Sequence, residues 1–238
     1  MAEQTSKENL HLKEELALYE APARVLRQIA DVALWGFVGP SGSGKDTLMD
    51  WLVAHRPDLF ARVVGDATRK KQKNDIEGLT HHFRTKQEMI DDLHNRRFVQ
   101  VAPGSVGNFY ATRPKQYPKS VIAMKAIYAR EMANFRRLGF KKVKWLQIVP
   151  YSDGAWQEWG GVRQQNSQDQ LERNQEAIES YKLALMNPDT YFVLNDNIEE
   201  AGQRIVRIAQ GRLLPNAVEA KQIAVHNLDA LKSRVKIT

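Results

Sequence analysis

Short apolar runs and helically spaced apolar residues take turns along most of the chain. The short runs are typical of buried strands and predict them at residues 32–38, 61–65, 97–102, 108–112, 120–124, 143–149 and 190–194. Apolar residues three and four apart predict helices at 5–19, 23–29, 45–56, 85–95, 126–137, 152–186, 198–210 and 216–234. Strands that alternate with helices favour an α/β fold in which helices cover both faces of a central parallel sheet.

Three parts of the chain follow from this pattern. Residues 1–30 form a helical extension, residues 31–211 carry the alternating strands and helices, and residues 212–238 form a second helical extension. The stretch 66–118 interrupts the alternation with a polar loop and two short strands around Pro103 and Gly104. We interpret this stretch as a small insert, and we expect the two extensions to serve partner binding or homo-oligomer formation.

Residues 39–47 join the first predicted strand to a helix and read Gly-Pro-Ser-Gly-Ser-Gly-Lys-Asp-Thr. They satisfy the phosphate-binding pattern G-x-x-x-x-G-K-[ST] up to its lysine. Glycine lets backbone N–H groups converge on phosphate oxygens, the helix N-terminus adds a partial positive charge, and Lys45 adds a full one. The stretch predicts a three-layer P-loop NTPase fold with a nucleoside triphosphate bound by Gly39, Ser41, Gly42, Ser43, Gly44, Lys45, Asp46 and Thr47.

The composition is that of a globular protein with an excess of basic residues. Hydrophobic residues make up 42%, and 35 Lys and Arg against 28 Asp and Glu give a formal net charge of +7. Basic residues gather at 69–73 and at 136–144, and such clusters attract phosphate. The first cluster is a candidate grip for a small phosphorylated substrate. A nucleic-acid partner fits the charge too, but we do not favour one, because no recognised nucleic-acid module occurs in the sequence.

The lack of cysteines limits the chemistry open to the protein, and the lengths of its apolar runs bear on its cellular location. Zero cysteines exclude disulfides, thiolate catalysis and cysteine-ligated zinc. No stretch approaches the roughly 20 consecutive apolar residues of a membrane span, and the N-terminus lacks a basic-then-apolar signal pattern. We therefore expect a cytoplasmic protein that does not enter the membrane.

Motifs in residues 32–210 follow an order that resembles the guanylate kinase family. After the loop come Thr68 and Arg69, and then residues 78–83 read Gly-Leu-Thr-His-His-Phe where the family has G-x-D-Y-H-F. Residues 108–112 read Asn-Phe-Tyr-Ala-Thr where the family has G-N-Y-Y-G-[ST], and residues 193–196 read Val-Leu-Asn-Asp where it has V-I-V-N-D. The resemblance implies a nucleoside monophosphate kinase that uses ATP and Mg²⁺. It also implies that the insert at 66–118 binds the monophosphate and that 152–175 is a mobile lid.

The resemblance implies roles for individual residues as well. The loop would hold the donor phosphates, Asn195 would lie near the donor adenine, and the lid arginines would neutralise the transferring group. The implied catalytic residues are Lys45, Arg69, Arg163 and Arg173. The implied acceptor-binding residues are Arg69, His81, Gln100, Tyr110 and Thr112.

Several family positions carry a different residue here. Gln72 replaces an arginine that grips phosphate, His81 replaces a phosphate-binding tyrosine, and Gln100 replaces a glutamate that reads guanine. The D-x-D strand end falls on Ala123, Met124 and Lys125, so two carboxylates that accept from the guanine edge are absent. The prediction of phosphoryl transfer to a nucleoside monophosphate therefore does not extend to specificity for GMP.

One branch of the family shares the unusual loop. Ribose 1,5-bisphosphate phosphokinases also read G-P-S-G-S-G-K-D-[ST] and also lack the D-x-D pair. Here Asp46 stands where the pattern wants a Mg²⁺-binding Ser or Thr, and the hydroxyl follows at Thr47. By this resemblance Asp46 and Thr47 would be the residues directed toward Mg²⁺ and the donor phosphate.

Three functions remain open on the sequence. The first is ATP-dependent phosphoryl transfer to a nucleoside monophosphate or a similar small phosphorylated acceptor. The second is a guanylate kinase-like nucleotide-binding or protein-interaction module that has lost efficient catalysis, and the third is an NTPase linked to nucleic acid. Some of the residues also have structural interpretations: strand packing for Tyr110 and Thr112, core or lid packing for Trp156 and Trp159, and a solvated helix face for Glu172, Glu176 and Glu179.

Overall fold

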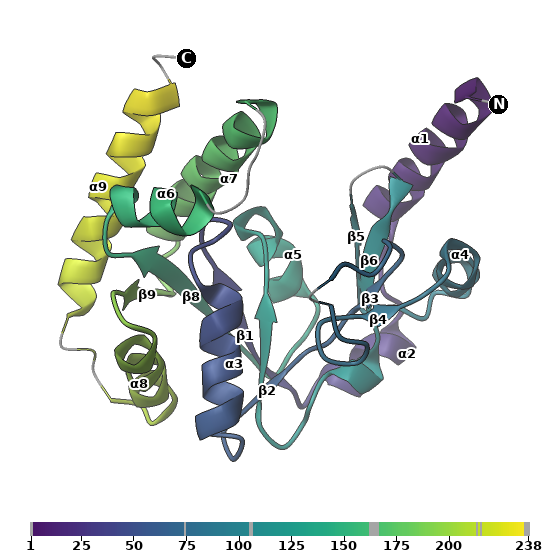
Figure 1. Ribbon diagram of the computed structural model, residues 1–238. Coiled ribbons are helices and arrows are strands. Elements are labelled where there is room, and N and C mark those ends of the chain that lie inside the picture. Colours follow the sequence, from purple (N-terminus) through teal and green to yellow (C-terminus); the bar gives the residue numbers. More distant parts are fainter. Residues whose placement is uncertain are drawn as a thin grey trace. The chain divides into compact units, whose positions relative to one another are not determined.

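The computed structural model describes residues 2–73, 75–104, 107–161, 167–212, 214 and 216–235, with side chains described except at 2–9, 160–161 and 167–169. Within it the chain divides into two compact units (Figure 1). The first unit comprises Met1–Val32, Arg62–Ser120 and Arg137–Lys141. The second unit comprises Ala33–Ala61, Val121–Arg136 and Lys142–Thr238.

The second unit is built on a five-stranded sheet in the order β2-β7-β1-β8-β9. The strands are β2 (Phe60–Arg62), β7 (Ile122–Ala126), β1 (Ala33–Val38), β8 (Lys142–Pro150) and β9 (Thr190–Asn195). β1 pairs in parallel with β7 and β8, and β8 pairs in parallel with β9. The central β1 is almost entirely buried, as expected for a strand covered on both faces. The predicted parallel sheet is confirmed.

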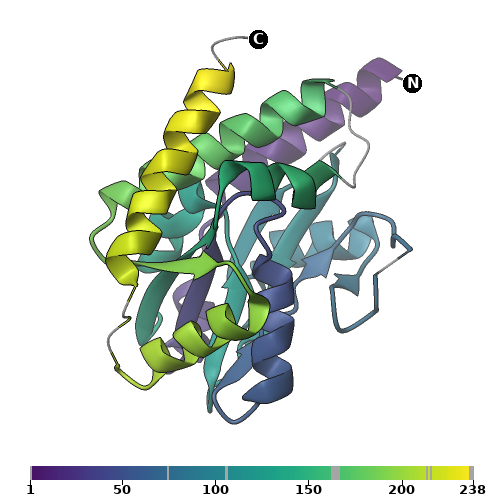
Figure 2. The same cartoon turned by 60° about the vertical axis from the view of Figure 1, so that its left-hand side comes forward.

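Helices cover both faces of this sheet and give three layers (Figures 1 and 2). They are α3 (Lys45–His55), α6 (Asp153–Gly161), α7 (Ser167–Met186), α8 (Ile198–Ala209) and α9 (Ala217–Val235). Successive residues of a strand point to opposite faces. Accordingly, Ile148 of β8 packs with α3 and α8, whereas Val149 packs with α6, α7 and α9. The predicted three-layer α/β fold is therefore confirmed.

The connection after β7 differs in detail from the prediction. A helix was expected at 126–137, and the structure has a 3-10 turn, η4 (Ala129–Glu131), that leads into the short helix α5 (Met132–Arg137). Met132 and Phe135 are the buried residues of α5. The apolar spacing predicts the helix. The residues at which that helix was expected to begin belong instead to the end of β7, to the segment after it and to η4.

The first unit contains a four-stranded sheet in the order β4-β3-β6-β5. The strands are β4 (His82–Phe83), β3 (Asp66–Ala67), β6 (Phe109–Thr112) and β5 (Gln100–Pro103). β3 pairs in parallel with β4 and antiparallel with β6, and β5 pairs antiparallel with β6. β6 matches the strand predicted at 108–112, and β5 overlaps the strand predicted at 97–102 but begins later, at Gln100. β3 and β4 are too short to show an alternating pattern. The strand predicted at 61–65 overlaps β2 and ends earlier, at Arg62.

The N-terminal helix α1 (Ala2–Leu18) contributes to the core of the first unit. Leu12 and Leu16 are buried there in a cluster with Met89, Leu93, Phe98 and Phe109. The Tyr19 hydroxyl donates to the Phe98 carbonyl at 2.7 Å and accepts from the Phe98 N–H at 3.0 Å. The extension predicted from the sequence is therefore anchored by apolar burial and by a two-way hydrogen bond.

The described part of the first unit also contains shorter helical elements. They are α2 (Ala23–Leu26), which continues into the 3-10 turn η1 (Arg27–Ile29), the helix α4 (Lys86–His94), and the 3-10 turn η3 (Pro114–Gln116). α4 begins at a capping box, in which Thr85 and Glu88 each accept from the other's backbone N–H. The box explains why the chain turns into a helix at this point.

The C-terminal helix α9 belongs to the core of the second unit. Its apolar side packs on α7 and β9 through Ala220, Ala224, Leu228 and Leu231. Asn227 Nδ2 donates to the Pro150 carbonyl at 2.9 Å, and Arg234 forms an ion pair with Asp153 at the start of α6. In the part of the chain that the structure describes, neither α9 nor any other helix has the length and apolarity to cross a membrane.

Close packing between α3 and α8 gives a test of the layer arrangement. A Cβ at Gly202 of α8 would come within 2.2 Å of Trp51 Cε3 on α3. We expect Gly202→Ala to lower the free energy of unfolding by about 1–3 kcal/mol, because overpacking outweighs the roughly 1 kcal/mol that alanine gains in a helix. Urea unfolding followed by circular dichroism measures the change.

Gly154→Ala is the matched control for this substitution. It lies in α6, and the nearest atom to a Cβ there is Ser152 Oγ at 3.8 Å, an ordinary contact. We expect this variant to be at least as stable as the unchanged chain. An equally stable Gly202→Ala variant would show that α3 and α8 are not closely packed at this point.

Candidate functional site

The phosphate-binding loop predicted at residues 39–47 connects β1 to α3 in the second unit. Gly39, Gly42 and Gly44 have φ angles of 140°, 82° and 88°, in the left-handed region that favours glycine. A Cβ at Gly39 would lie 2.7 Å from the Ile148 carbonyl oxygen, and one at Gly44 would lie 2.4 Å from Asn195 Nδ2. The turn therefore needs glycine both for its backbone angles and for its close packing.

The Lys45 ammonium is held by the loop itself. Its Nζ donates to the Gly39 carbonyl at 2.7 Å and to the Pro40 carbonyl at 2.8 Å. Burial lowers the pKa of Lys45 from 10.5 to about 8, and the carboxylates of Glu176 and Asp46 oppose this decrease. With a pKa about one unit above neutrality, the amine is mostly protonated at pH 7. The loop thus carries a full positive charge at the start of α3.

Asn195 supports the loop from the end of β9. Its side chain is 2% exposed, and its Nδ2 donates to the Ser43 carbonyl at 2.9 Å. The same Nδ2 is the atom that a side chain at Gly44 would strike. The structure therefore brings Asn195 to the backbone of the loop, and its predicted place near the donor adenine stays a prediction.

Asp46 and Thr47 occupy the first turn of α3, and both are exposed. A carboxylate and a hydroxyl are oxygen ligands of the kind that Mg²⁺ prefers. Among the described residues, no three His, Asp or Glu side chains converge as a metal-binding group. At a nucleotide site Mg²⁺ takes one or two carboxylates and completes its shell with phosphate and water. The two residues suit the predicted ion, and their role as its ligands stays a prediction.

The carbonyl oxygen of Ser41 joins the loop to the two helices of the predicted lid. Trp156 Nε1 on α6 donates to it at 2.8 Å, and Arg173 Nη2 on α7 donates to it at 3.2 Å. The Arg173 guanidinium lies 6.0 Å from the centre of the Trp156 ring. The structure therefore brings Arg173 to the loop and adds Trp156, which the sequence assigned to packing. A buried indole N–H needs an acceptor, and that requirement is the signal by which Trp156 could have been found.

Three other positions of the predicted lid have no described contact with the phosphate-binding loop: Arg163, Trp159 and Asn174. Arg163 lies outside the described residues, so its predicted contact with the transferring group stays a prediction. Trp159 is 38% exposed and packs edge-on against Tyr151, with ring centres 5.9 Å apart. Asn174 is buried, and its Oδ1 accepts from Gln170 Nε2 at 3.3 Å within α7.

Glu176 follows Arg173 by three residues on α7 and differs in exposure from Glu172. It is half-buried, whereas Glu172 is exposed. Burial raises the pKa of Glu176, and the positive charges of Lys45, Arg130 and Arg173 oppose the increase. The interpretation of this glutamate as part of a solvated helix face is therefore wrong.

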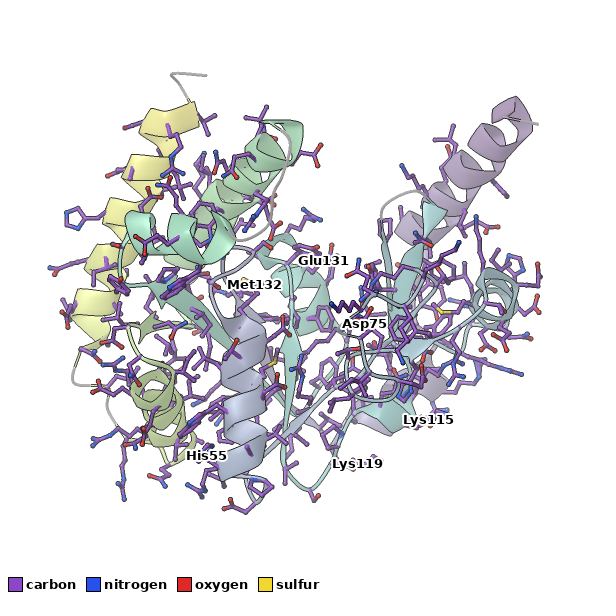
Figure 3. All side chains as sticks on the ribbon, viewed as in Figure 1. His55, Asp75, Lys115, Lys119, Glu131 and Met132 are labelled. Atoms are coloured by element: carbon purple, nitrogen blue, oxygen red, sulfur yellow. The ribbon has the colours of Figure 1, made fainter. Side chains whose placement is uncertain are left out.

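Arg69, the predicted acceptor-phosphate ligand, forms a two-point ion pair in the first unit. Its guanidinium donates to Asp75 Oδ2 at 2.5 Å and to Asp75 Oδ1 at 2.9 Å. The hydrogen bond from Arg69 holds the pKa of Asp75 far below its usual range, so the carboxylate is ionised at neutral pH. Asp75 lies on the long loop between β3 and β4 (Figure 3). A phosphate at Arg69 has to share the guanidinium with this carboxylate.

Two other predicted acceptor residues surround Arg69. Its Nη2 is 3.5 Å from His81 Nδ1, and the rings of His81 and Tyr110 are 5.6 Å apart. The guanidinium also lies 5.3 Å from the centre of the Phe83 ring. The structure therefore brings Arg69, His81 and Tyr110 together, and we call these three residues the acceptor cluster.

Gln100 and Thr112, the remaining predicted acceptor residues, are opposite each other in the pairing of β5 with β6. Gln100 Nε2 donates to the Val101 carbonyl at 2.8 Å. Thr112 is buried, and its hydroxyl is 2.9 Å from the hydroxyl of Tyr117. Both side chains therefore use part of their hydrogen-bonding capacity inside the first unit.

The end of β7 lies beside the strand that leads into the phosphate-binding loop. Ala123 is buried and is the pairing partner of Leu34 in β1, and Lys125 is the partner of Gly36. A methyl group and an amine therefore occupy the positions at which the sequence comparison expected two carboxylates. Neither side chain can accept a hydrogen bond from a guanine N–H.

Comparison with known proteins gives one consistent result. The family model described as guanylate kinase matches residues 36–211. Guanylate kinase of Bacillus anthracis is 25% identical over 176 residues, which cover 73% of this chain and 85% of that protein. Guanylate kinase of Clostridium perfringens is 27% identical over 210 residues, which cover 79% of this chain and 90% of that protein.

A solved structure agrees with these matches in fold. The crystal structure of guanylate kinase from Anaplasma phagocytophilum matches with a TM-score of 0.56 at 20% identity, over 78% of this chain and 88% of that chain. The region matched by the family model contains the phosphate-binding loop, the acceptor cluster and α7. At the coarse level the family supports a phosphotransferase of the nucleotide kinase type. The resemblance inferred from the motifs is confirmed, and the chain belongs to the guanylate kinase family.

Proposed function

We propose that this chain transfers the terminal phosphoryl group of ATP to a nucleoside monophosphate or a similar small phosphorylated acceptor, with GMP disfavoured. The observation that carries the proposal is the loop at residues 39–47, in which left-handed glycines and the Lys45 ammonium stand at the start of α3. A loop of this kind suits the phosphates of a nucleoside triphosphate. Membership of the guanylate kinase family supports the same class of reaction.

The second unit would bind the donor. Lys45 would exchange the carbonyl oxygens of Gly39 and Pro40 for phosphate oxygens, while backbone N–H groups at the start of α3 bind the remaining oxygens. Mg²⁺, when bound, would supply positive charge that offsets the negative charge of the donor phosphates. Asp46 and Thr47 would hold the ion, since both are exposed beside the loop.

Arg173 would act on the transferring phosphoryl group. Its bond to the Ser41 carbonyl keeps a cation beside the loop, and phosphoryl transfer depends on positioning and on neutralising charge. Trp156 shares the same carbonyl and lies against the guanidinium, so we assign it as a positioning residue. Arg163 would add a second cation from the predicted lid.

The first unit would bind the acceptor through its phosphate. The acceptor cluster offers a guanidinium, an imidazole and a phenol, and charge-assisted bonds from Arg to phosphate are strong. Gln100 and Thr112 are bonded within the unit, and position 123 carries no carboxylate. A guanine N–H that a carboxylate at position 123 would have bound lacks that partner, at a cost of about 1–3 kcal/mol. These contacts support an acceptor recognised more by its phosphate than by a guanine base.

A second candidate is a nucleotide-binding or protein-interaction module without efficient turnover. The observation that favours it is the ion pair between Arg69 and Asp75, because it occupies the guanidinium that would bind the acceptor phosphate. Such a module would still bind ATP at the loop, but it would release no ADP because it would not transfer the phosphoryl group. The two candidates therefore differ in turnover and not in donor binding.

A coupled assay of ADP release tests the proposal over the common nucleoside and deoxynucleoside monophosphates and ribose 1,5-bisphosphate. We expect Mg²⁺-dependent ADP release with one class of acceptor. Lys45→Ala should lower kcat/KM by about 100-fold or more, because it removes a cation from the transferring phosphate. Lys119→Ala is the matched control, since Lys119, labelled in Figure 3, is an exposed lysine of the first unit and is not a member of the acceptor cluster. Folded protein that binds ATP and turns over none of the acceptors would contradict the proposed kinase activity and favour the binding module.

The lowered pKa of Lys45 predicts how donor affinity changes with pH. The ammonium that binds phosphate is present below about pH 8 and is lost above it. We therefore expect ATP affinity, measured by calorimetry in EDTA, to be constant from pH 7 to about 8. Above that it should fall by about tenfold per pH unit, until the pKa of the bound form is reached.

Lys45→Arg separates this titration from other effects of alkaline pH. The guanidinium stays charged throughout the range, so the break near pH 8 should disappear. The charged groups that act on Lys45 are Glu176 and Asp46, and both remain in this variant. A break of equal size in Lys45→Arg would show that another group controls the pH dependence.

A further inference from the structure

The Glu176 carboxylate acts electrostatically on the Lys45 ammonium. Of the two carboxylates that act on Lys45, Glu176 has the larger effect and Asp46 the smaller. Glu176 is half-buried on α7, three residues after Arg173, whose Nη2 donates to the Ser41 carbonyl. Residues three apart share a helix face, so Glu176 lies on the side of α7 that contacts the loop.

A carboxylate at this position opposes triphosphate binding unless a cation lies between the two anions. Like charges repel more strongly where water is partly excluded, and Glu176 is half-buried. Arg130 also acts on Glu176, but its Nη1 pairs with Glu179 Oε2 at 3.6 Å. A Glu176 that served only as counter-ion to Lys45 would weaken donor binding, because the phosphate takes over that ammonium.

Mg²⁺ is the cation that usually lies between phosphates and carboxylates at phosphoryl-transfer sites. It keeps several waters and uses one or two carboxylates together with the substrate phosphates. The end of β7 offers Ala123 and Lys125 instead of carboxylates, and Asp46 is exposed. Of the two carboxylates that act on Lys45, Glu176 is half-buried and Asp46 is exposed.

We infer that Glu176 directs Mg²⁺ to the donor phosphates, either as a ligand or through one water molecule. This inference rests on the ATP site of the proposed function. It moves the main metal-directed carboxylate from Asp46 on α3 to α7. One helix then supplies both the cation that faces the phosphates, Arg173, and the anion that faces the metal.

Binding of a non-hydrolysable ATP analogue, measured by calorimetry with Mg²⁺ and with EDTA, tests the inference without turnover. For the unchanged chain we expect Mg²⁺ to tighten binding. For Glu176→Gln we expect about a 10-fold or greater loss of that Mg²⁺-dependent gain. In EDTA the same variant should bind at least as tightly as the unchanged chain, because a repulsive charge has been removed. The opposite effects separate a metal-directing residue from a structural one.

Glu172→Gln is the matched control, because it removes the same charge from an exposed position one turn earlier on α7. We expect it to keep the full Mg²⁺-dependent gain. Asp46→Asn provides the comparison with the residue predicted from the sequence. Loss of the gain in Asp46→Asn but not in Glu176→Gln would overturn the inference. Tighter binding of Glu176→Gln by the same factor in both conditions would overturn it as well, since Glu176 would then be a counter-ion only.

Electron paramagnetic resonance of Mn²⁺ gives a second readout. In the presence of the analogue, Glu176→Gln should bind Mn²⁺ about 10-fold more weakly than the unchanged chain or Glu172→Gln. If the unchanged chain binds the analogue and Mg²⁺ does not strengthen the binding, the inference fails and the ATP site stands. If the unchanged chain does not bind the analogue in either condition, both fail.

Discussion

A charged amine held inside a backbone turn is the interaction on which the proposed donor site depends. Lys45 donates to the carbonyls of Gly39 and Pro40, and the turn that presents those carbonyls has left-handed angles at three glycines. Because the ammonium is partly desolvated, its charge acts on a phosphate more strongly than that of a solvated lysine. The cost of that desolvation appears in the lowered pKa of Lys45. The loop is thus arranged for an anion before one binds.

The core of the second unit holds this turn in place. β1 lies between β7 and β8, and the loop leaves the carboxyl end of β1, where open α/β sheets bind their ligands. Residues distant in the sequence then bond the loop carbonyls: Asn195 from β9 bonds that of Ser43, and Trp156 and Arg173 from α6 and α7 bond that of Ser41. The geometry of nine residues therefore depends on packing throughout the unit.

Local patterns could be read from the sequence, whereas contacts between distant elements could not. The loop is contiguous, so its glycines and Lys45 predict both the turn and the ligand class. By contrast, the burial of Glu176 depends on how α7 packs, and the charges that act on it come from distant parts of the chain. Arg69 and Asp75 are only six residues apart in the sequence. Their ion pair could still not be predicted, because the loop between them has no regular spacing. A strand of two residues, such as β3, is too short to show the alternation of apolar and polar residues that predicts a strand.

The central claim is that Lys45 exchanges two loop carbonyls for the donor phosphates. A crystal structure with an ATP analogue and Mg²⁺ tests it most directly. The account predicts Lys45 Nζ within about 3 Å of a phosphate oxygen and released from Gly39 and Pro40. The bonds from Asn195 to Ser43 and from Trp156 to Ser41 should stay near 2.9 Å and 2.8 Å. An analogue bound elsewhere, with Lys45 still on both carbonyls, would contradict it.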